Sequence, residues 1–412
     1  MQKVYLPAKT QFHLTTFIKK QVCKKRACFL NHEENHMKDL KPVICVCLMS
    51  AMLMASQALS PGISQLMVLY GAGESAVSLS ITLPYLIAVP FALIAGNLAE
   101  KYSLRGLLLS GGVLICITGL GPYFVTDFAA VLLMRGCMGI GLGLLFTLTP
   151  AMAPAYYPEG AMRNLTIGMQ SAWAGSGGFV FNILSGYLVR KKAQNIYLVY
   201  GLCVLFVVIV WILLPTLTVG EKKEKCSGFK PDGLFTGFLT FLFLSAGMTI
   251  ALSVSVYLPE RGLGGSVESG YVTSAYSAAA FIVGCLYILF AKILKERAVT
   301  AACLLAALGM FLCVFGGNLP CICIGSGMAG AGLSLFMPGC INRIICTVPA
   351  DDVSMSIAVM MVGSCLGQTF SGAIINPVAS LFGSGISIRF IVAAVLLLVT
   401  ALLSAVTSSK KR

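Results

Sequence analysis

The sequence predicts an all-α integral membrane protein with twelve transmembrane helices in two six-helix bundles. Composition, the length of the apolar segments and the distribution of charge all lead to this prediction. Hydrophobic residues make up 58% of the 412 residues, whereas charged residues make up only 11%. A water-soluble core of this composition would lack polar surface, while segments of roughly 20 apolar residues are long enough to cross a bilayer.

Twelve apolar segments reach this length. Only helices and closed barrels satisfy their own backbone hydrogen bonds in lipid, and barrel strands alternate over about ten residues. The segments here are longer and continuously apolar, so we interpret them as helices. In chain order they cover approximately 42–66, 77–98, 104–125, 128–153, 164–189, 195–217, 234–258, 268–290, 298–316, 319–342, 353–381 and 387–408.

The net charge of +14 follows the predicted topology. If the N-terminus is cytoplasmic, 23 of the 29 Lys and Arg residues fall on the cytoplasmic side, with the cluster at 190–192 as the local exception. This asymmetry is the positive-inside rule, and it predicts that both termini are cytoplasmic. We therefore expect a multi-pass protein of the plasma membrane that contacts anionic lipid and binds no nucleic acid.

The polar ends are predicted to lie outside the bundles. Residues 1–41 are expected to form a disordered, basic cytoplasmic tail, and residues 409–412 a short second tail. Cys23, Cys28, His32 and His36 could bind zinc by residue type, but their spacing is too compressed for the usual arrangement, so we predict no metal site. Translation could also start at Met37. Most of the sixteen cysteines stand singly in apolar spans, and we expect no disulfide.

The chain divides into two similar halves. The charged segment 218–233 separates an N-terminal bundle at 42–217 from a C-terminal bundle at 234–408. Prolines recur at a similar offset on the two sides of this segment: Pro150 and Pro158 in the first half correspond to Pro338 and Pro349 in the second. Parallel repeats of six spans predict two bundles related by a pseudo-twofold axis along the membrane normal, with a site between them.

A short charged turn follows the second span. It contains Gly96, Glu100, Lys101 and Arg105 between two apolar segments. This turn resembles the signature loop of the major facilitator superfamily, although Ser103 stands where that family usually has glycine. The resemblance implies a twelve-helix transporter in which these four residues form a cytoplasmic gate that latches the two bundles together.

Arg135 is the only basic residue predicted deep within a span. It lies about eight residues, or roughly 12 Å, into the fourth span from the outer side. A charge at this depth is a functional candidate unless it reaches the interface. Arg135 with the following Gly136 and Gly139 also resembles the superfamily motif in which an arginine helps to couple ion and substrate binding.

Two further features of the sequence limit the substrates and transport mechanisms that we expect. In the fifth span, Gly177 and Gly178 are kept, but Trp173 and Ala174 stand where the Gly-Pro pair of many antiporters belongs. All fifteen Asp and Glu residues map to the tail, to loops or to span ends. Because no carboxylate is predicted near the midplane, we expect a neutral or anionic substrate, with Arg135 attracting it or shaping the local field.

Several polar and aromatic residues are predicted to line a central pocket. Interhelical hydrogen bonding is an alternative role for each one, but together they fit a mostly apolar pocket with a few oriented polar groups. With Arg135, the predicted substrate-binding or coupling residues are Gln57, Tyr85, Gln170, Trp173, Asn182, Tyr276 and Gln368.

These observations predict a secondary transporter that moves a small solute by alternating access. The favoured hypothesis is uptake of a metabolite or organic anion, and efflux of lipophilic drugs is the alternative within the family. A non-transporting sensor or scaffold is the alternative from another class. An enzyme is not expected, because no His, Cys or carboxylate constellation lies at depth. We predict no cofactor, H⁺ or Na⁺ as the coupling ion, and a monomer.

Overall fold

The structure is a computed structural model that describes residues 40–157, 161–214, 231–294, 297–349, 352–383 and 385–409. The tail residues Cys23, Cys28, His32 and His36 lie outside the described residues, as do Met37 and most of the predicted linker. Within the described residues the protein is helical and contains no strand.

Within the described residues, six helical segments form the N-terminal half; we call each one a crossing, whether it is a single helix or a run of consecutive helices. The first is broken into three parts, and two others combine an α-helix with a 3₁₀ segment. In order they are α2 (Lys41–Met52), η1 (Ala55–Gly62) and α3 (Ile63–Tyr70); α4 (Glu74–Lys101); α5 (Leu104–Leu120) with η2 (Gly121–Phe124); α6 (Phe128–Tyr156); α7 (Ala161–Lys191); and η3 (Ala193–Tyr200) with α8 (Gly201–Leu213).

The C-terminal half contains six further crossings. In the described residues its first helix runs from Pro231, three residues before the predicted 234, and Pro231 and Asp232 are compatible with the first turn of a helix. The crossings are α9 (Pro231–Glu260); α10 (Ser266–Cys285) with α11 (Tyr287–Leu294); α12 (Ala298–Phe315); α13 (Leu319–Thr347); α14 (Val353–Ser380); and α15 (Ser387–Ser409).

Ten of these crossings are long and apolar enough to span a membrane by composition alone. Helices α7 and α10 are not among the ten, since both are rich in Gly, Ser and Ala. The membrane fold is confirmed, while the exact count of twelve spans stays a prediction.

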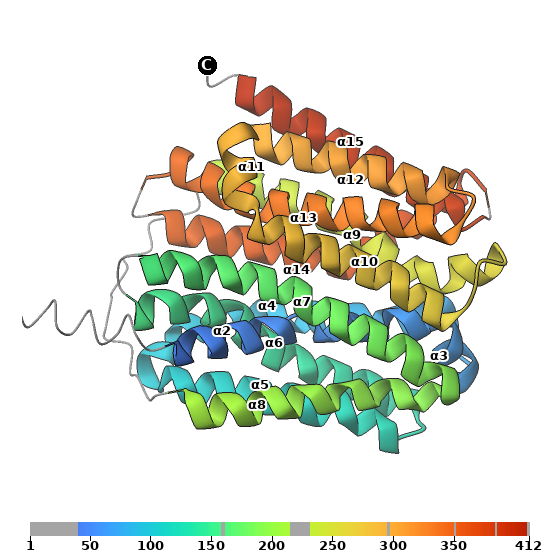
Figure 1. The fold of residues 1–412 in the computed structure, drawn as a ribbon, viewed down its shortest axis with the longest axis horizontal. Helices are drawn as coiled ribbons and strands as arrows, with labels where there is room; N and C mark the ends of the chain where they lie inside the picture. The colour runs from blue at the N-terminus through green and yellow to red at the C-terminus, as the bar shows by residue number, and fades with distance from the viewer. Residues whose placement is uncertain are drawn as a thin grey trace, which may run out of the picture.

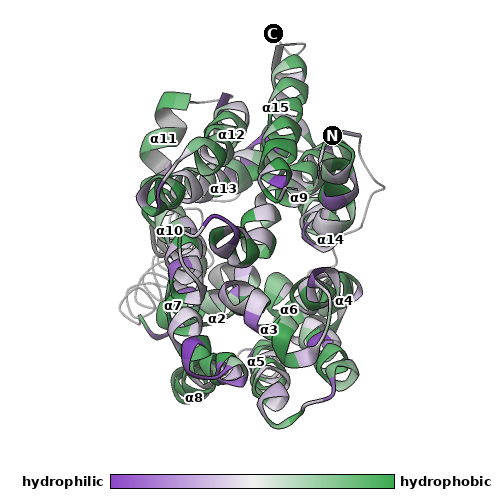
Figure 2. Ribbon diagram, turned by 90° about the vertical axis from the view of Figure 1, so that its right-hand side faces the viewer, coloured by the Kyte–Doolittle hydropathy of each residue, from purple (hydrophilic) through white to green (hydrophobic). Residues whose placement is uncertain are grey.

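The two halves lie one above the other, with α2–α8 below and α9–α15 above (Figure 1). The view along the helices separates the same two groups (Figure 2). Helix α2 begins and α15 ends at the same end of the molecule, which we call the terminal end. The opposite end is the distal end, and the charge asymmetry predicts that it faces the outside.

Close packing of small residues joins the bundles along α7 and α10. A Cβ atom on Gly175 would lie 2.9 Å from both Ser277 O and Phe281 N, and one on Gly186 would lie 2.8 Å from Ser266 O. Real Cβ atoms do not approach backbone this closely, so glycine is required for this helix separation. The low hydropathy of the two helices therefore reflects their packing against each other.

Gly175→Ala should separate α7 from α10. We expect it to lower the free energy of unfolding by about 1–3 kcal/mol through overpacking. Gly201→Ala is the matched control, because a Cβ there meets no atom within 4 Å; it should be neutral or stabilise the helix by up to about 1 kcal/mol. Thermal unfolding of both variants in detergent measures the difference, and equal melting temperatures would contradict this account.

Candidate functional site

The first crossing changes from α-helix to 3₁₀ helix near its middle. Pro61 removes one backbone donor and Gly62 lowers helix propensity, so a continuous α-helix is disfavoured there. Within η1 the N–H of Gln57 bonds to Met54 O at 3.1 Å, a tighter i→i+3 turn. This irregular backbone presents carbonyl oxygens to side chains of other helices.

Arg135 of α6 supplies hydrogen-bond donors to part of this irregular segment. Its Nη2 donates to Ser56 O at 2.9 Å and to Ser56 Oγ at 3.1 Å. Its Nε donates to Ser80 O at 2.7 Å, and its Nη1 donates to Tyr200 OH at 2.6 Å and contacts Met138 Sδ at 3.0 Å. The Tyr200 hydroxyl in turn donates to Ala55 O at 2.8 Å.

This network explains how a guanidinium is tolerated at 0% exposure. Each of its five N–H directions meets an oxygen or sulfur atom of the N-terminal bundle, and the partners come from three other crossings. Neutral polar groups, rather than a carboxylate, therefore stabilise the buried guanidinium. The partners Ser56, Ser80 and Tyr200 were not predicted; for Tyr200 the sequence signal was a pair of tyrosines, Tyr197 and Tyr200, in a mostly apolar span.

Gln57, the residue after Ser56, lies where the two bundles meet. Its Nε2 is 3.5 Å from Gln368 Oε1 of α14 and 3.7 Å from Met248 Sδ of α9. The Nε2 of Gln368 reaches Ser364 Oγ at 3.3 Å within α14. All four residues stand near the middle of their crossings. We call Gln57, Tyr85, Met248, Ser364 and Gln368 the central layer.

Tyr85 of α4 completes the central layer. It is fully buried, and its hydroxyl lies beside Gln57 without a hydrogen bond of normal geometry. The structure thus brings together three predicted residues, Gln57, Tyr85 and Gln368. Met248 was missed, because a methionine in an apolar span carries no signal of its own.

Among the described residues, the other predicted pocket residues form no hydrogen bond with Gln57 or Gln368. Asn182 is buried in the distal half of α7, and its Nδ2 donates to Thr273 O of α10 at 3.3 Å. Gln170 and Trp173 are partly buried in α7, with Trp173 against the N-terminal core. Tyr276 of α10 is partly buried, and its hydroxyl lies 3.7 Å from the position of a Cβ on Gly247 of α9.

The distal end carries polar contacts between the bundles that were not predicted. The hydroxyls of Ser64 (α3) and Ser255 (α9) lie 2.9 Å apart, and Ser64 Oγ also donates to Ser255 O at 2.9 Å. Arg389 at the start of α15 forms an ion pair with Glu74 at the start of α4. These pairs are separated by 191 and 315 residues, so only the tertiary structure reveals them.

Comparison with protein families agrees with this geometry. The chain matches the sequence profile of the Major Facilitator Superfamily over residues 45–329. It belongs to this superfamily. Membership makes the protein a transporter rather than an enzyme. A comparison with curated protein sequences gives no match.

Solved structures of superfamily transporters share the fold. A POT family transporter in complex with 5-aminolevulinic acid aligns with a TM-score of 0.72 at 14% identity, over 90% of this chain and 96% of that chain. A mutant of the nucleoside transporter NupG aligns with a TM-score of 0.69 at 14% identity, over 90% of this chain and 98% of that one. At this identity the alignments establish the fold alone.

The superfamily loop at 96–106 is well formed at the terminal end. Ser103, which replaces the usual glycine, accepts a hydrogen bond from Gly106 N at 3.2 Å and caps α5. Arg105 donates to Trp211 O in the last turn of α8, a contact within the N-terminal bundle. Gly96 and Lys101 are exposed, and the side chain of Glu100 is outside the described part. Latching of the two bundles by this loop stays a prediction.

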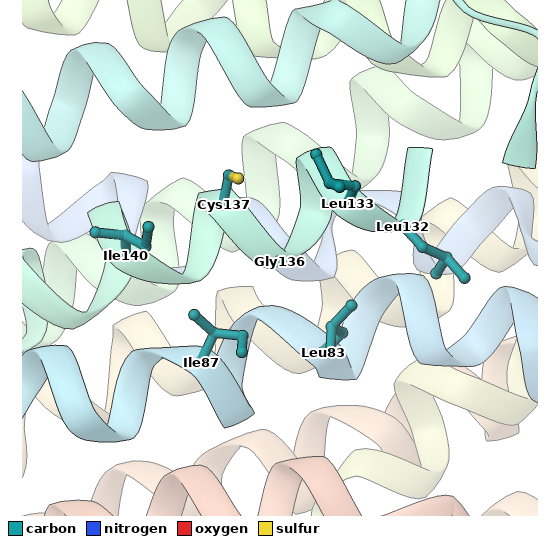
Figure 3. Close-up of a pocket in the computed structure, with 7 residues that line it drawn as sticks. All are labelled: Leu83, Ile87, Leu132, Leu133, Gly136, Cys137 and Ile140. Carbon is teal, nitrogen blue, oxygen red and sulfur yellow. The ribbon is translucent and has the colours of Figure 1, made fainter. Parts of the chain in front are cut away.

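An apolar groove of about 420 Å³ lies between α4 and α6 (Figure 3). Leu133 on its wall is 69% exposed, so the groove opens away from the protein towards the surrounding lipid. Since it holds no hydrogen-bonding group suited to orient a polar solute, we do not assign it as the transport site. Its lining residues are Leu83, Ile87, Leu132, Leu133, Gly136, Cys137 and Ile140.

Replacing Arg135 tests its contribution to the broken first crossing. Arg135→Gln should lower the free energy of unfolding by at least about 2 kcal/mol, because buried oxygens at Ser56 and Ser80 lose their donors. Arg190→Gln is the control, since Arg190 is exposed. Thermal unfolding in detergent distinguishes the two variants, and an unchanged melting temperature for Arg135→Gln would refute the structural role.

Proposed function

We propose that the protein is a secondary transporter that moves a small solute by alternating access between its two bundles. The observation that carries this proposal is the central layer, where Gln57 of one bundle meets Gln368 of the other. Polar side chains in an otherwise apolar contact can orient a solute. Their position halfway along the crossings makes them accessible from either side once one end opens.

The distal contacts suggest how one side is kept closed. Breaking the Ser64–Ser255 hydrogen bonds and the Glu74–Arg389 ion pair would be required for the distal ends of the bundles to part. Both pairs lie at the distal end of the bundles, so a small rotation of one bundle separates them. We infer that the described conformation is one closed to the predicted outside.

The central layer favours a metabolite over a lipophilic drug, because it contains four side chains with amide or hydroxyl groups. We propose an uncharged metabolite rather than an organic anion, because the N–H groups of Arg135 donate within one bundle and the central layer holds no cation to pair with an anion. Uptake remains the direction that we propose, and H⁺ or Na⁺ remains the proposed coupling ion.

A disulfide across the distal contact tests alternating access. In the double variant Ser64→Cys with Ser255→Cys, the hydroxyl separation of 2.9 Å places the two Cβ atoms within reach of a disulfide. Oxidation should stop transport by holding the distal end closed, and a reducing agent should restore it. The measurement is loss of solutes from liposomes that contain the protein and are loaded with a metabolite extract.

Each single cysteine variant under the same oxidant is the control for the sixteen native cysteines. These variants should keep transport. Full transport by the oxidised, cross-linked double variant would contradict the proposal, because a transporter with a permanently closed distal end cannot complete its cycle. Repeating the measurement with pH and Na⁺ gradients identifies the coupling ion.

A further inference from the structure

We propose that the central layer recognises an uncharged solute through a carboxamide-like group, in which an N–H donor adjoins a C=O acceptor. This inference rests on the proposed function and specifies the substrate class of the same site. It is drawn from three features of the central layer: its lack of formal charge, the loose pairing of its two amides, and the Tyr85 hydroxyl, which forms no hydrogen bond of normal geometry.

The first feature is electrical neutrality. The five side chains of the central layer carry no formal charge, and two of them are primary amides. The nearest described guanidinium, Arg135, is fully buried behind Ser56 and donates to protein atoms. An ionised solute would leave water without meeting an opposite charge, which is strongly unfavourable. The central layer therefore selects against ammonium groups and offers a carboxylate no ion-pair partner.

The second feature is the contact between Gln57 and Gln368. Their separation of 3.5 Å is at the outer limit of a hydrogen bond, so little is lost when the contact is replaced. Each side chain offers both a carbonyl acceptor and N–H donors. A solute amide has the same complementary pair, and it can bond to both glutamines where the two now meet only weakly.

The third feature is the Tyr85 hydroxyl. It is completely buried and forms no hydrogen bond of normal geometry, although most buried polar groups form one. Its position beside Gln57 makes it available to a solute carbonyl or N–H held between the amides. A solute that supplies this missing hydrogen bond is favoured over an apolar one of the same shape.

The same geometry links recognition to the transport cycle. Gln57 belongs to the N-terminal bundle, whereas Gln368 and Ser364 belong to the C-terminal bundle. A carboxamide bonded to both glutamines bridges the bundles directly. The contacts of Arg135 and Tyr200 with the preceding backbone hold Gln57 at this interface, which makes them positioning residues.

Matched amide and carboxylate solutes test the proposal. Liposomes containing the full chain are loaded with a metabolite extract supplemented with gluconamide, gluconate, nicotinamide and nicotinate. Solute loss is followed by mass spectrometry and corrected with protein-free liposomes. We expect amides and ureides to leave at least about tenfold faster than the carboxylates, because a polar site discriminates strongly against a mismatched group.

Variants then assign the effect to the central layer. Gln57→Leu and Gln368→Leu should each slow amide efflux by about tenfold or more, since a buried hydrogen bond is lost. Gln194→Leu, at the distal end of the sixth crossing, is the matched control and should leave efflux unchanged. Gln368→Glu should make efflux fall as pH rises, because it adds an ionisable group to the central layer. This pH dependence would not arise from a packing defect.

The outcomes separate the two proposals. Efflux of carboxylates without amides, or amide efflux unaffected by both leucine variants and by Gln368→Glu, would overturn the amide site while leaving the transport function intact. If no solute leaves, the proposed function fails and this inference fails with it. Melting temperatures of the variants near that of the native protein confirm that the comparison is made on folded protein.

Discussion

The structure depends on the interaction of one buried guanidinium with a broken helix. The 3₁₀ segment η1 leaves carbonyl oxygens that would be costly in a membrane interior if they had no donor. Arg135 and Tyr200 supply those donors, and the irregular backbone in turn supplies the dipoles that make a buried positive charge tolerable. Together the two parts fix Gln57 at the boundary between the bundles.

That boundary combines two kinds of contact. Along α7 and α10, glycines such as Gly175 allow backbones to touch, which gives extensive van der Waals contact with few directional bonds. At the distal end, Ser64–Ser255 and Glu74–Arg389 add directional bonds that form or break as units. Close backbone contact along α7 and α10, together with distal bonds that can be broken, suits bundles that change their relative tilt without repacking their cores.

Membership in the major facilitator superfamily accounts for the fold, whereas the side chains of the central layer determine its local chemistry. The signature loop is kept, but Ser103 replaces a glycine and acts as a helix cap. The substitution is tolerated because Ser103 adopts an extended backbone conformation that does not require glycine. In the same way, the Gly-Pro pair of antiporters is replaced by Trp173 and Ala174, and Trp173 packs into the N-terminal core.

The sequence by itself determined the membrane class, the helical segments and the family, because apolar length, charge asymmetry and local motifs are properties of neighbouring residues. It also identified Gln57, Tyr85 and Gln368 as polar residues within apolar spans. Only the tertiary structure decided that these three meet while Asn182 and Trp173 do not join them. It also revealed the partners of Arg135 and the distal pairs, since contacts between residues as far apart as 74 and 389 depend on how the two bundles pack.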